Sequence, residues 1–390
     1  MIIPKLAYRN LIGAGLRTWL NVIVLSFSFV VIIWHKGFLE GWNQEARRDM
    51  INWEIGGGIY WHTGYDPYDM FSLEDGHGKL NEQIQKRVQD GSLTPILIRQ
   101  ATIYPQGRMQ SALLKGIDPA QKILDLPTGS LKSDSDEIPA IIGTRMAKNN
   151  HLEPGNVMTV RWRDVNGTFD ATEIRIVKIF KTNVPTVDNA QLWIPIQKLR
   201  EMTQLPNEAT ILVSRTGQQD NPEYAGWSFK NHDYLLKEID EVIRSKSIGG
   251  SVLYLILLLL AMLAIFDTQV LSIFRRQKEI GTHMALGMTR GQVIRLFTVE
   301  GAMHGILAAI VAAIYGVPLL YLQAKYGFSM PAASDDYGLA IAEKIFPVYS
   351  LGLVAGTITI VLIVVTIVSF LPTRRIAKMN PTEAIKGKIQ

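Results

Sequence analysis

Four long runs of apolar residues dominate the pattern of the chain. A helix needs about 20 predominantly apolar residues to cross the hydrocarbon core of a bilayer. Runs of this length cover residues 19–38, 248–273, 301–322 and 347–371. The second and fourth runs are too apolar for core helices of a soluble protein. We therefore predict four transmembrane helices, one near the N-terminus and three in the second half of the chain.

The first run could instead be a signal peptide, because Lys5, Arg9 and Arg17 precede it. The residues that follow it, GFLEGWNQEARRDM, contain no small-x-small cleavage site. We interpret this run as an uncleaved membrane anchor.

The basic residues are concentrated on one side of the predicted membrane. The segments before the first run, between the second and third runs, and after the fourth run carry 13 Lys or Arg against 3 acidic residues. Residues 37–247 carry 24 basic and 28 acidic residues. The positive-inside rule then predicts both termini in the cytoplasm and residues 37–247 outside. The net charge of +5 reflects this topology and not a nucleic-acid-binding face.

The 210 residues or so between the first two spans are too long for a loop and must fold. Alternating apolar residues predict strands, and the Asn166-Gly167 pair predicts a hairpin between two of them. The predicted strands cover 93–104, 111–117, 138–142, 157–163, 169–180, 191–194 and 209–214, and helices are expected at 80–89, 196–203 and 234–244. Gly56, Gly57 and Gly58 suggest a flexible turn. The expected fold class is an α-helical membrane protein with four spans, one plus three, and a large α+β domain inserted between the first two.

The expected organisation follows from these patterns. In chain order it is a cytoplasmic amphipathic helix (1–18), the first span (19–38), the external domain (39–247), the second span (248–273), a cytoplasmic coupling loop (274–300), the third span (301–322), a short external loop (323–346), the fourth span (347–371) and a cytoplasmic tail (372–390).

No pattern of catalytic residues is apparent. The chain has no cysteine, which excludes disulfides, thiol catalysis and cysteine–zinc sites, and it has no P-loop or G-x-S-x-G sequence. His62 and His77, with neighbouring carboxylates, match no metal-binding spacing, and we expect a solvated loop there without a metal. Asp267, Glu300 and His304 lie near the inner ends of spans, where a structural role is favoured over a proton relay.

The segment between the second and third spans is unusually ordered in pattern. Glycines at 281, 287 and 291 punctuate alternating apolar and basic residues. This predicts a short helix on a glycine-bounded elbow. Such a helix can insert into a groove of a partner subunit, or it can rest on the lipid surface as an amphipathic helix. The pattern alone leaves both open.

This segment resembles the signature loop of the FtsX-like permease superfamily of ABC transporters. Its R-x-x-E-I-G-x-x-x-A-L-G core begins at Arg276, and the tail after residue 371 resembles the C-terminal motif of the same family. The N-terminal LAYRNL at 6–11 is similar to the opening helix of the family. The resemblance implies ATPase-coupling residues Arg276, Glu279, Ile280, Gly281, Met284, Ala285, Leu286, Gly287, Met288 and Gln292, and a tail motif of Arg374, Arg375, Pro381, Glu383 and Ala384.

The external region resembles the periplasmic domain of the LolC/LolE and MacB permeases. The similar stretches are the IDP at 117–119, the IPAIIG at 138–143 and the LEPGN at 152–156. MacB carries its ATPase domain before the first span, whereas 18 residues precede it here. The resemblance therefore favours a LolC/LolE-type permease without catalytic activity of its own, and segment 53–78 departs from the pattern.

The resemblance implies a subunit in the bacterial inner membrane that releases lipoproteins. It implies as partners a separate dimeric ATPase that binds ATP and Mg²⁺, a second permease copy or paralogue, membrane lipids, and a periplasmic lipoprotein carrier or adaptor. No cofactor is expected on this chain. The alternatives are MacB-like efflux of peptides or antibiotics, and an FtsX-like signalling scaffold or envelope-stress sensor.

Overall fold

The computed structural model describes residues 15–132, 137–218, 221–329 and 344–376. The chain divides into two compact units. The first, here called the helical unit, includes the described residues 15–42, 242–329 and 344–376. The second, here called the inserted domain, includes the described residues between Asn43 and Glu241. Residues 1–14 of the expected N-terminal helix and residues 377–390 of the tail lie outside the described residues.

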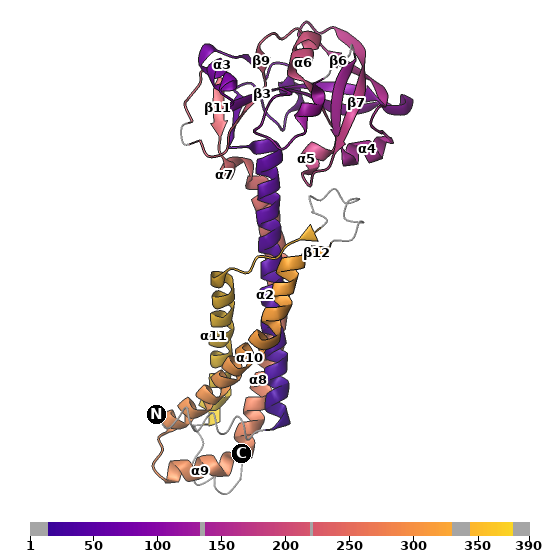
Figure 1. Cartoon of the computed structure of the whole chain (residues 1–390). Coiled ribbons are helices and arrows are strands. Elements are labelled where there is room, and N and C mark those ends of the chain that lie inside the picture. The colour runs from indigo at the N-terminus through magenta and orange to yellow at the C-terminus, as the bar shows by residue number, and fades with distance from the viewer. Residues whose placement is uncertain (1–14, 133–136, 219–220, 330–343, 377–390) are drawn as a thin grey trace. The chain divides into compact units, whose positions relative to one another are not determined.

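Four long helices carry the apolar runs (Figure 1). They are α2 (Leu16–Met50), α8 (Lys237–Arg275), α10 (Arg290–Tyr326) and α11 (Leu351–Ile376), with the short α9 (Gln277–Ala285) between α8 and α10 and the strand pair β12 (Phe328–Ser329) and β13 (Lys344–Ile345) between α10 and α11. Within the described part of the chain, these four helices are long and apolar enough to cross a membrane. The prediction of four spans, one plus three, is confirmed.

Small and branched side chains hold the helical unit together. Val22, Leu25 and Phe29 of α2 pack with Ala308 of α10 and Val365 of α11, all of them buried. The outward positions of the helices remain apolar and exposed, such as Leu263, which is 66% exposed. An exposed apolar surface of this kind is what a lipid environment requires.

Two of the helices are longer than a bilayer needs. At 1.5 Å per residue, the 35 residues of α2 and the 39 residues of α8 each extend more than about 50 Å, whereas the hydrocarbon core is about 30 Å thick. Both helices therefore continue beyond the spans predicted at 19–38 and 248–273. Arg47 of α2 donates two hydrogen bonds, of 2.6 and 2.7 Å, to the carboxylate of Asp240 in α8. This ion pair ties the two helices where they enter the inserted domain.

The inserted domain is an α+β fold. Its strands are β1 (Ile59–His62), β2 (Gly78–Lys79), β3 (Leu93–Tyr104), β4 (Gln110–Ile117), β5 (Ile138–Gly143), β6 (Val157–Arg163), β7 (Phe169–Phe180), β8 (Gln191–Pro195), β9 (Glu208–Ala209), β10 (Ile211–Ser214) and β11 (Trp227–Lys230). Its helices are α3 (Glu82–Gln89), α4 (Thr144–Asn150), α5 (Pro185–Asp188), α6 (Ile196–Thr203) and α7 (His232–Leu235), with short helical turns η1 (Ile51–Ile55), η2 (Met70–Leu73), η3 (Pro105–Gly107) and η4 (Thr128–Leu131).

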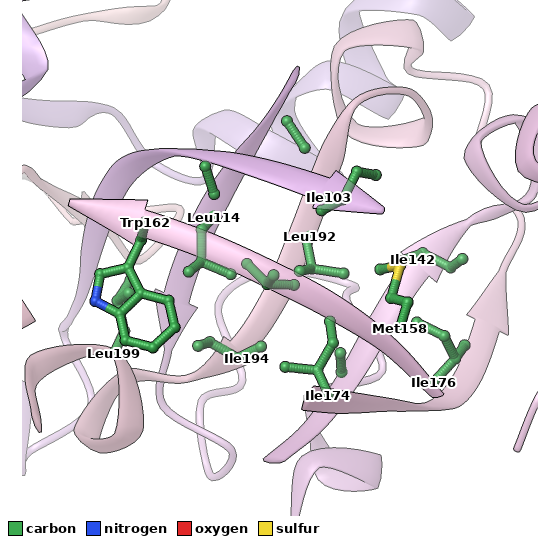
Figure 2. Packing of buried hydrophobic residues seen from close by; sticks show 14 of the residues in the cluster. Ile103, Leu114, Ile142, Met158, Trp162, Ile174, Ile176, Leu192, Ile194 and Leu199 are labelled. Atoms are coloured by element: carbon green, nitrogen blue, oxygen red, sulfur yellow. The ribbon is translucent and has the colours of Figure 1, made fainter. Parts of the chain in front are cut away.

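Nine of the strands form one sheet that closes partly on itself. The strand order is β11-β1-β10-β3-β4-β8-β5-β7-β6, and β6 also pairs with β3. In sheet order, the strands β3, β4, β8, β5, β7 and β6 therefore form a closed barrel. Closure by the pairing of β6 with β3 removes two exposed sheet edges. Its interior is filled by apolar side chains such as Leu114, Ile174, Leu192 and Ile194, which are fully buried (Figure 2).

Candidate functional site

The loop between α8 and α10 is a compact folded element. It consists of Arg276, α9 and residues 286–289, and we call it the α9 loop. The α9 helix is followed by Gly287, whose φ of 99° lies in the region that favours glycine. Thr289 then caps α10: its hydroxyl accepts from the amide of Gln292, whose side chain accepts in turn from the amide of Thr289. This reciprocal capping box fixes where α10 begins.

The inner face of the α9 loop packs on the ends of α8 and α10. Ile280 of α9 is buried with Ile273 of α8 and with Phe297 of α10. Met284 and Met288 are partly buried against the same cluster. Of the predicted coupling residues, these three apolar side chains therefore hold the loop in place.

The tip of the loop is exposed. Leu286 is 81% exposed, and the neighbouring Ala285 and Gly287 are exposed as well. A leucine this exposed beside a tight glycine turn provides an apolar projection on a rigid base. The arrangement suits insertion into a groove.

Arg276 anchors the loop to the third span. Its guanidinium lies 3.0 Å from the carboxylate of Glu300 and 2.9 Å from that of Glu279, and it stacks over the ring of Phe297 at 5.2 Å. Burial lowers the pKa of Arg276, but the hydrogen bonds and charges of the two carboxylates raise it, and the net shift is upward. Glu300 itself is only 4% exposed. This ion pair was not evident from the sequence, because its members lie 24 residues apart on different helices.

A layer of polar residues lies next to Glu300. The imidazole Nδ1 of His304 lies 3.0 Å from the carbonyl oxygen of Glu300. Gly301 lets Ser369 of α11 approach so closely that any side chain at 301 would collide with it. Gln269 of α8 is buried beside them. The helices α8, α10 and α11 therefore approach one another at Gly301, next to the buried Glu300 and His304, while Asp267 is exposed.

The predicted tail motif is only partly visible. Arg374 lies exposed in the last turn of α11, and Arg375 belongs to the same helix. Pro381, Glu383 and Ala384 lie outside the described residues.

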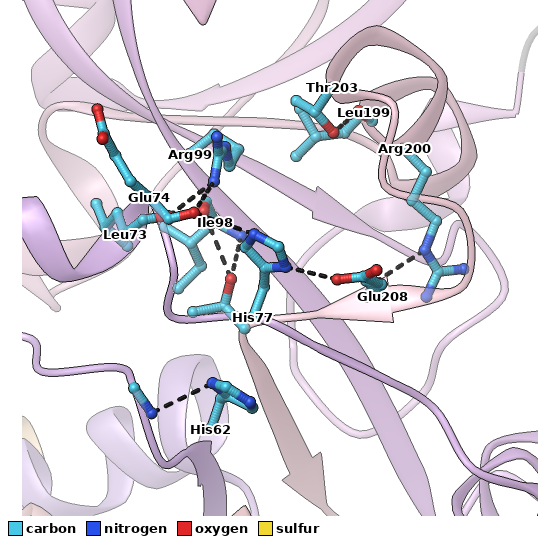
Figure 3. A network of polar contacts seen from close by, with 12 residues as sticks. His62, Leu73, Glu74, His77, Ile98, Arg99, Leu199, Arg200, Thr203 and Glu208 are labelled. Atoms are coloured by element: carbon cyan, nitrogen blue, oxygen red, sulfur yellow. Dashed lines mark hydrogen bonds and ion pairs between the residues drawn. The ribbon is translucent and has the colours of Figure 1, made fainter. Parts of the chain in front are cut away.

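The histidines of the inserted domain take part in a structural network (Figure 3). His77 lies 2.5 Å from the carboxylate of Glu208, and its Nε2 lies 3.0 Å from the carbonyl oxygen of Glu74. Arg200 donates to the carbonyl oxygen of Glu208 at 3.0 Å. These contacts join β2, β9 and α6.

His62 belongs to the same part of the domain and is partly buried. Burial and then the neighbouring His77 lower the pKa of His62. Over the described residues, no group of three or more His, Asp or Glu is arranged to hold a metal ion.

Comparison with known proteins supports the same interpretation. Residues 251–381 match the family model of the FtsX-like permease C-terminal region, which covers most of α8, α9, α10 and α11. The lipoprotein-releasing system transmembrane protein LolC of Neisseria meningitidis is 22% identical over 75% of this chain and 77% of its own length. The macrolide export ATP-binding/permease protein MacB of Chromobacterium violaceum is 27% identical over 45% of this chain, which spans only 24% of that protein.

Two solved structures are also similar over part of the chain. The periplasmic region of MacB from Actinobacillus actinomycetemcomitans matches 48% of this chain with a TM-score of 0.32 and 14% identity. The extracellular domain of the transporter YknZ from Gram-positive bacteria matches 42% with a TM-score of 0.27 and 12% identity.

The four spans and the anchored loop define a multi-pass membrane permease subunit. The 390 residues contain no Walker A sequence. Residues 251–381 match the FtsX-like permease family, and the chain is similar to ABC transporter permeases of that type. Its permease class is thereby established, as a subunit of the FtsX and MacB type.

Proposed function

We propose that this chain couples ATP hydrolysis in a separate ATPase dimer to a conformational change of the inserted domain. The observation that carries the proposal is the α9 loop, an exposed apolar tip on a base locked by Arg276 and Glu300. The tip supplied by Ala285, Leu286 and Gly287 would enter a groove of the ATPase. Because ATP and Mg²⁺ bind in the partner, this chain needs no cofactor of its own.

The motion would pass from the α9 loop to α8 and α10 as rigid bodies. The Arg276–Glu300 pair joins the loop to α10, and the buried contact between Ile280 and Ile273 joins it to α8. The α8 helix then runs without a break into the inserted domain, as does α2. A second copy or a paralogue would complete the permease.

We propose further that both termini and the α9 loop are cytoplasmic and that the inserted domain is periplasmic, in a bacterial inner membrane. The 13 to 3 excess of basic over acidic residues in the segments assigned to the cytoplasm supports this orientation. The substrate proposed is a lipoprotein, released to a periplasmic carrier. The likeness to LolC over three quarters of the chain supports it.

The coupling proposal is tested at the tip of the loop. A charge at Leu286 would have to be desolvated on docking, so Leu286→Glu is expected to abolish the ATPase stimulation by the permease in a reconstituted complex. Leu286→Met keeps an apolar projection and serves as the matched control. Both variants are expected to insert in the membrane at wild-type levels. Unchanged stimulation by Leu286→Glu would refute the assignment.

The substrate is tested by co-purification from native membranes with mass spectrometry of bound proteins. An ATPase with lipidated proteins supports lipoprotein release. A membrane-fusion adaptor supports efflux of the kind named in the MacB relatives. A cell-wall hydrolase or a sensor kinase supports a signalling scaffold.

A further inference from the structure

The helical unit contains an apolar hollow among α2, α10 and α11. Its volume is about 380 Å³, within the range of small-molecule sites, about 300–1,000 Å³. The walls include Ala309, Ala312, Ala313, Gly316, Tyr321 and Tyr349. Every wall residue belongs to the helical unit, and none belongs to the α9 loop or to the polar layer at Glu300.

The hollow is long and narrow because of the residues on one face of α10. Ala309, Ala312, Ala313 and Gly316 follow the i, i+3, i+4, i+7 spacing that places residues on one helix face. At 1.5 Å per residue, the wall from Ala309 to Ala324 extends about 22 Å along the helix axis. An elongated groove of this length matches a hydrocarbon chain that lies parallel to the helices.

Glycine contacts keep the groove walls in place. A methyl group at Gly316 would lie 2.7 Å from Cγ2 of Val30, so α10 and α2 approach closely at this point. The alanines at 309, 312, 313 and 324, on either side of this point of α10, line the hollow with short side chains. The groove is therefore a consequence of close helix packing at one point with alanines on either side.

The groove opens to the side. Val317 and Tyr321 line it and are 62% and 65% exposed. The medium around a membrane span is hydrocarbon, and protein interiors tolerate few voids larger than a water molecule. Water is a poor occupant, because a water needs two to four polar partners and, apart from the hydroxyls of Tyr321 and Tyr349, the side chains of these walls are apolar.

One end of the groove carries an unused hydrogen-bond donor. The hydroxyl oxygen of Tyr349 is buried and has no partner among the described residues. Its ring is held against Gly37 of α2, where any side chain would collide with it. Buried tyrosine hydroxyls usually find a partner, which points to an acceptor supplied by the occupant. Tyr321, which also lines the groove, lies near the C-terminal end of α10. Tyrosines are enriched where transmembrane helices meet the lipid headgroups.

We propose that this groove binds one acyl chain of a membrane phospholipid. The lipid belongs to the leaflet in which α10 ends and α11 begins, its ester carbonyl accepts a hydrogen bond from Tyr349, and the chain follows the alanine face of α10. The proposal does not depend on the coupling proposed above, because no residue of the α9 loop lines the groove.

The test uses the intact protein in nanodiscs with a phosphatidylethanolamine that carries a photoreactive diazirine in one acyl chain. Adducts are mapped by peptide mass spectrometry. Ala313 lines the groove and is exposed. The phenyl ring of Ala313→Phe is therefore expected to occupy the groove without disturbing the packing of buried residues. Ala355 is equally exposed on α11 but does not line the groove, so Ala355→Phe is the matched control.

We expect adducts concentrated on the groove walls, reduced to background by Ala313→Phe and retained in Ala355→Phe. Tyr349→Phe is expected to raise the half-saturating lipid fraction about fivefold, the factor that one hydrogen bond of about 1 kcal/mol represents. Equal labelling in Ala313→Phe, or labelling no stronger than on the face around Ala355, would show only annular lipid and overturn the proposal. A lipidated peptide as the retained occupant in native mass spectrometry would also overturn it.

Discussion

Lys115 is a charged side chain inside the inserted domain. It is 5% exposed, its ammonium lies 4.9 Å from the ring centre of Trp193, and the carboxylate of Glu54 is 3.9 Å away. Glu54 is also held by a 2.7 Å hydrogen bond from Thr186. Burial lowers the pKa of Lys115, and the charge of Glu54 opposes this shift. The lysine therefore sits where an apolar side chain of similar length would fit as well.

We predict that Lys115→Met leaves the free energy of unfolding unchanged or raises it, because the substitution removes the cost of burying an ammonium and Glu54, which is 23% exposed, is not left fully buried without a partner. The carboxylate of Glu54 keeps its bond to Thr186 and partial solvent access. Thermal unfolding of the full-length protein in detergent measures the change. Glu54→Gln is the control, because it leaves the lysine buried without its counter-charge and is expected to destabilise. A large loss of stability in Lys115→Met would contradict this view.

The same residue predicts a pH dependence. Its pKa in the folded protein lies below the ordinary 10.5, so between these two values the unfolded chain binds more protons. Stability due to Lys115 therefore rises as the pH rises through that window. The stability difference between wild type and Lys115→Met is expected to shift in favour of wild type as the pH approaches 10.5. A difference that is constant with pH would show that the lysine titrates normally.

At the scale of elements, the ion pair between Arg276 and Glu300 is the polar contact that joins the α9 loop to α10. We predict that Glu300→Gln reduces ATPase stimulation, because the loss of a buried partner of Arg276 costs about 1–3 kcal/mol. The double variant Arg276→Glu with Glu300→Arg, which exchanges the two charges, is expected to recover part of the lost ATPase stimulation. ATP turnover of the reconstituted complex is the measurement, with membrane insertion as the control. Full stimulation in Glu300→Gln would exclude the pair from coupling.

The continuity of α2 leads to a second prediction about elements. Gln44 is exposed on the part of α2 that extends past the predicted span. Proline in a helix interior costs about 3 kcal/mol and kinks the helix. Gln44→Pro is expected to leave ATPase stimulation near normal but to stop substrate release, whereas Gln44→Ala retains both. Release measured with the reconstituted complex tests this, and normal release in Gln44→Pro would show that α2 need not be rigid.

The sequence predicts an element well when its own residues determine it, and poorly when pairing with a distant segment determines it. The strands at 157–163 and 169–180 were predicted with the observed bounds, because alternate positions such as Val160 and Trp162 are buried. Closure of the barrel could not be predicted, because it rests on pairing of Ala101 with Trp162 across 61 residues.

Two other predictions from the sequence were wrong because tertiary packing determines the structure of their segments. The strand at 59–62 was missed, because its pairing with β10 and β11 is not visible in a segment rich in Gly, His and aromatic residues. The glycines at 56–58, expected to form a flexible turn, pack against the chain instead. The amide of Gly57 donates to Ser214 at 2.7 Å, and a side chain there would collide with Arg215. The resemblance indicated the α9 loop correctly as a distinct element, while its anchor at Glu300 became visible only in three dimensions.

For the whole molecule, the absence of cysteine from the sequence makes the proposed orientation directly testable. Glu173 on β7 and Lys278 on α9 are both exposed, and each can be replaced by a single cysteine. In intact spheroplasts, a membrane-impermeant maleimide is expected to label Glu173→Cys and to leave Lys278→Cys unlabelled until the membrane is opened. The reason is the basic excess around the α9 loop, which predicts that this loop faces the cytoplasm. Labelling of Lys278→Cys in sealed spheroplasts would reverse the orientation, and an ATPase in the cytoplasm could then no longer reach the exposed tip at Leu286.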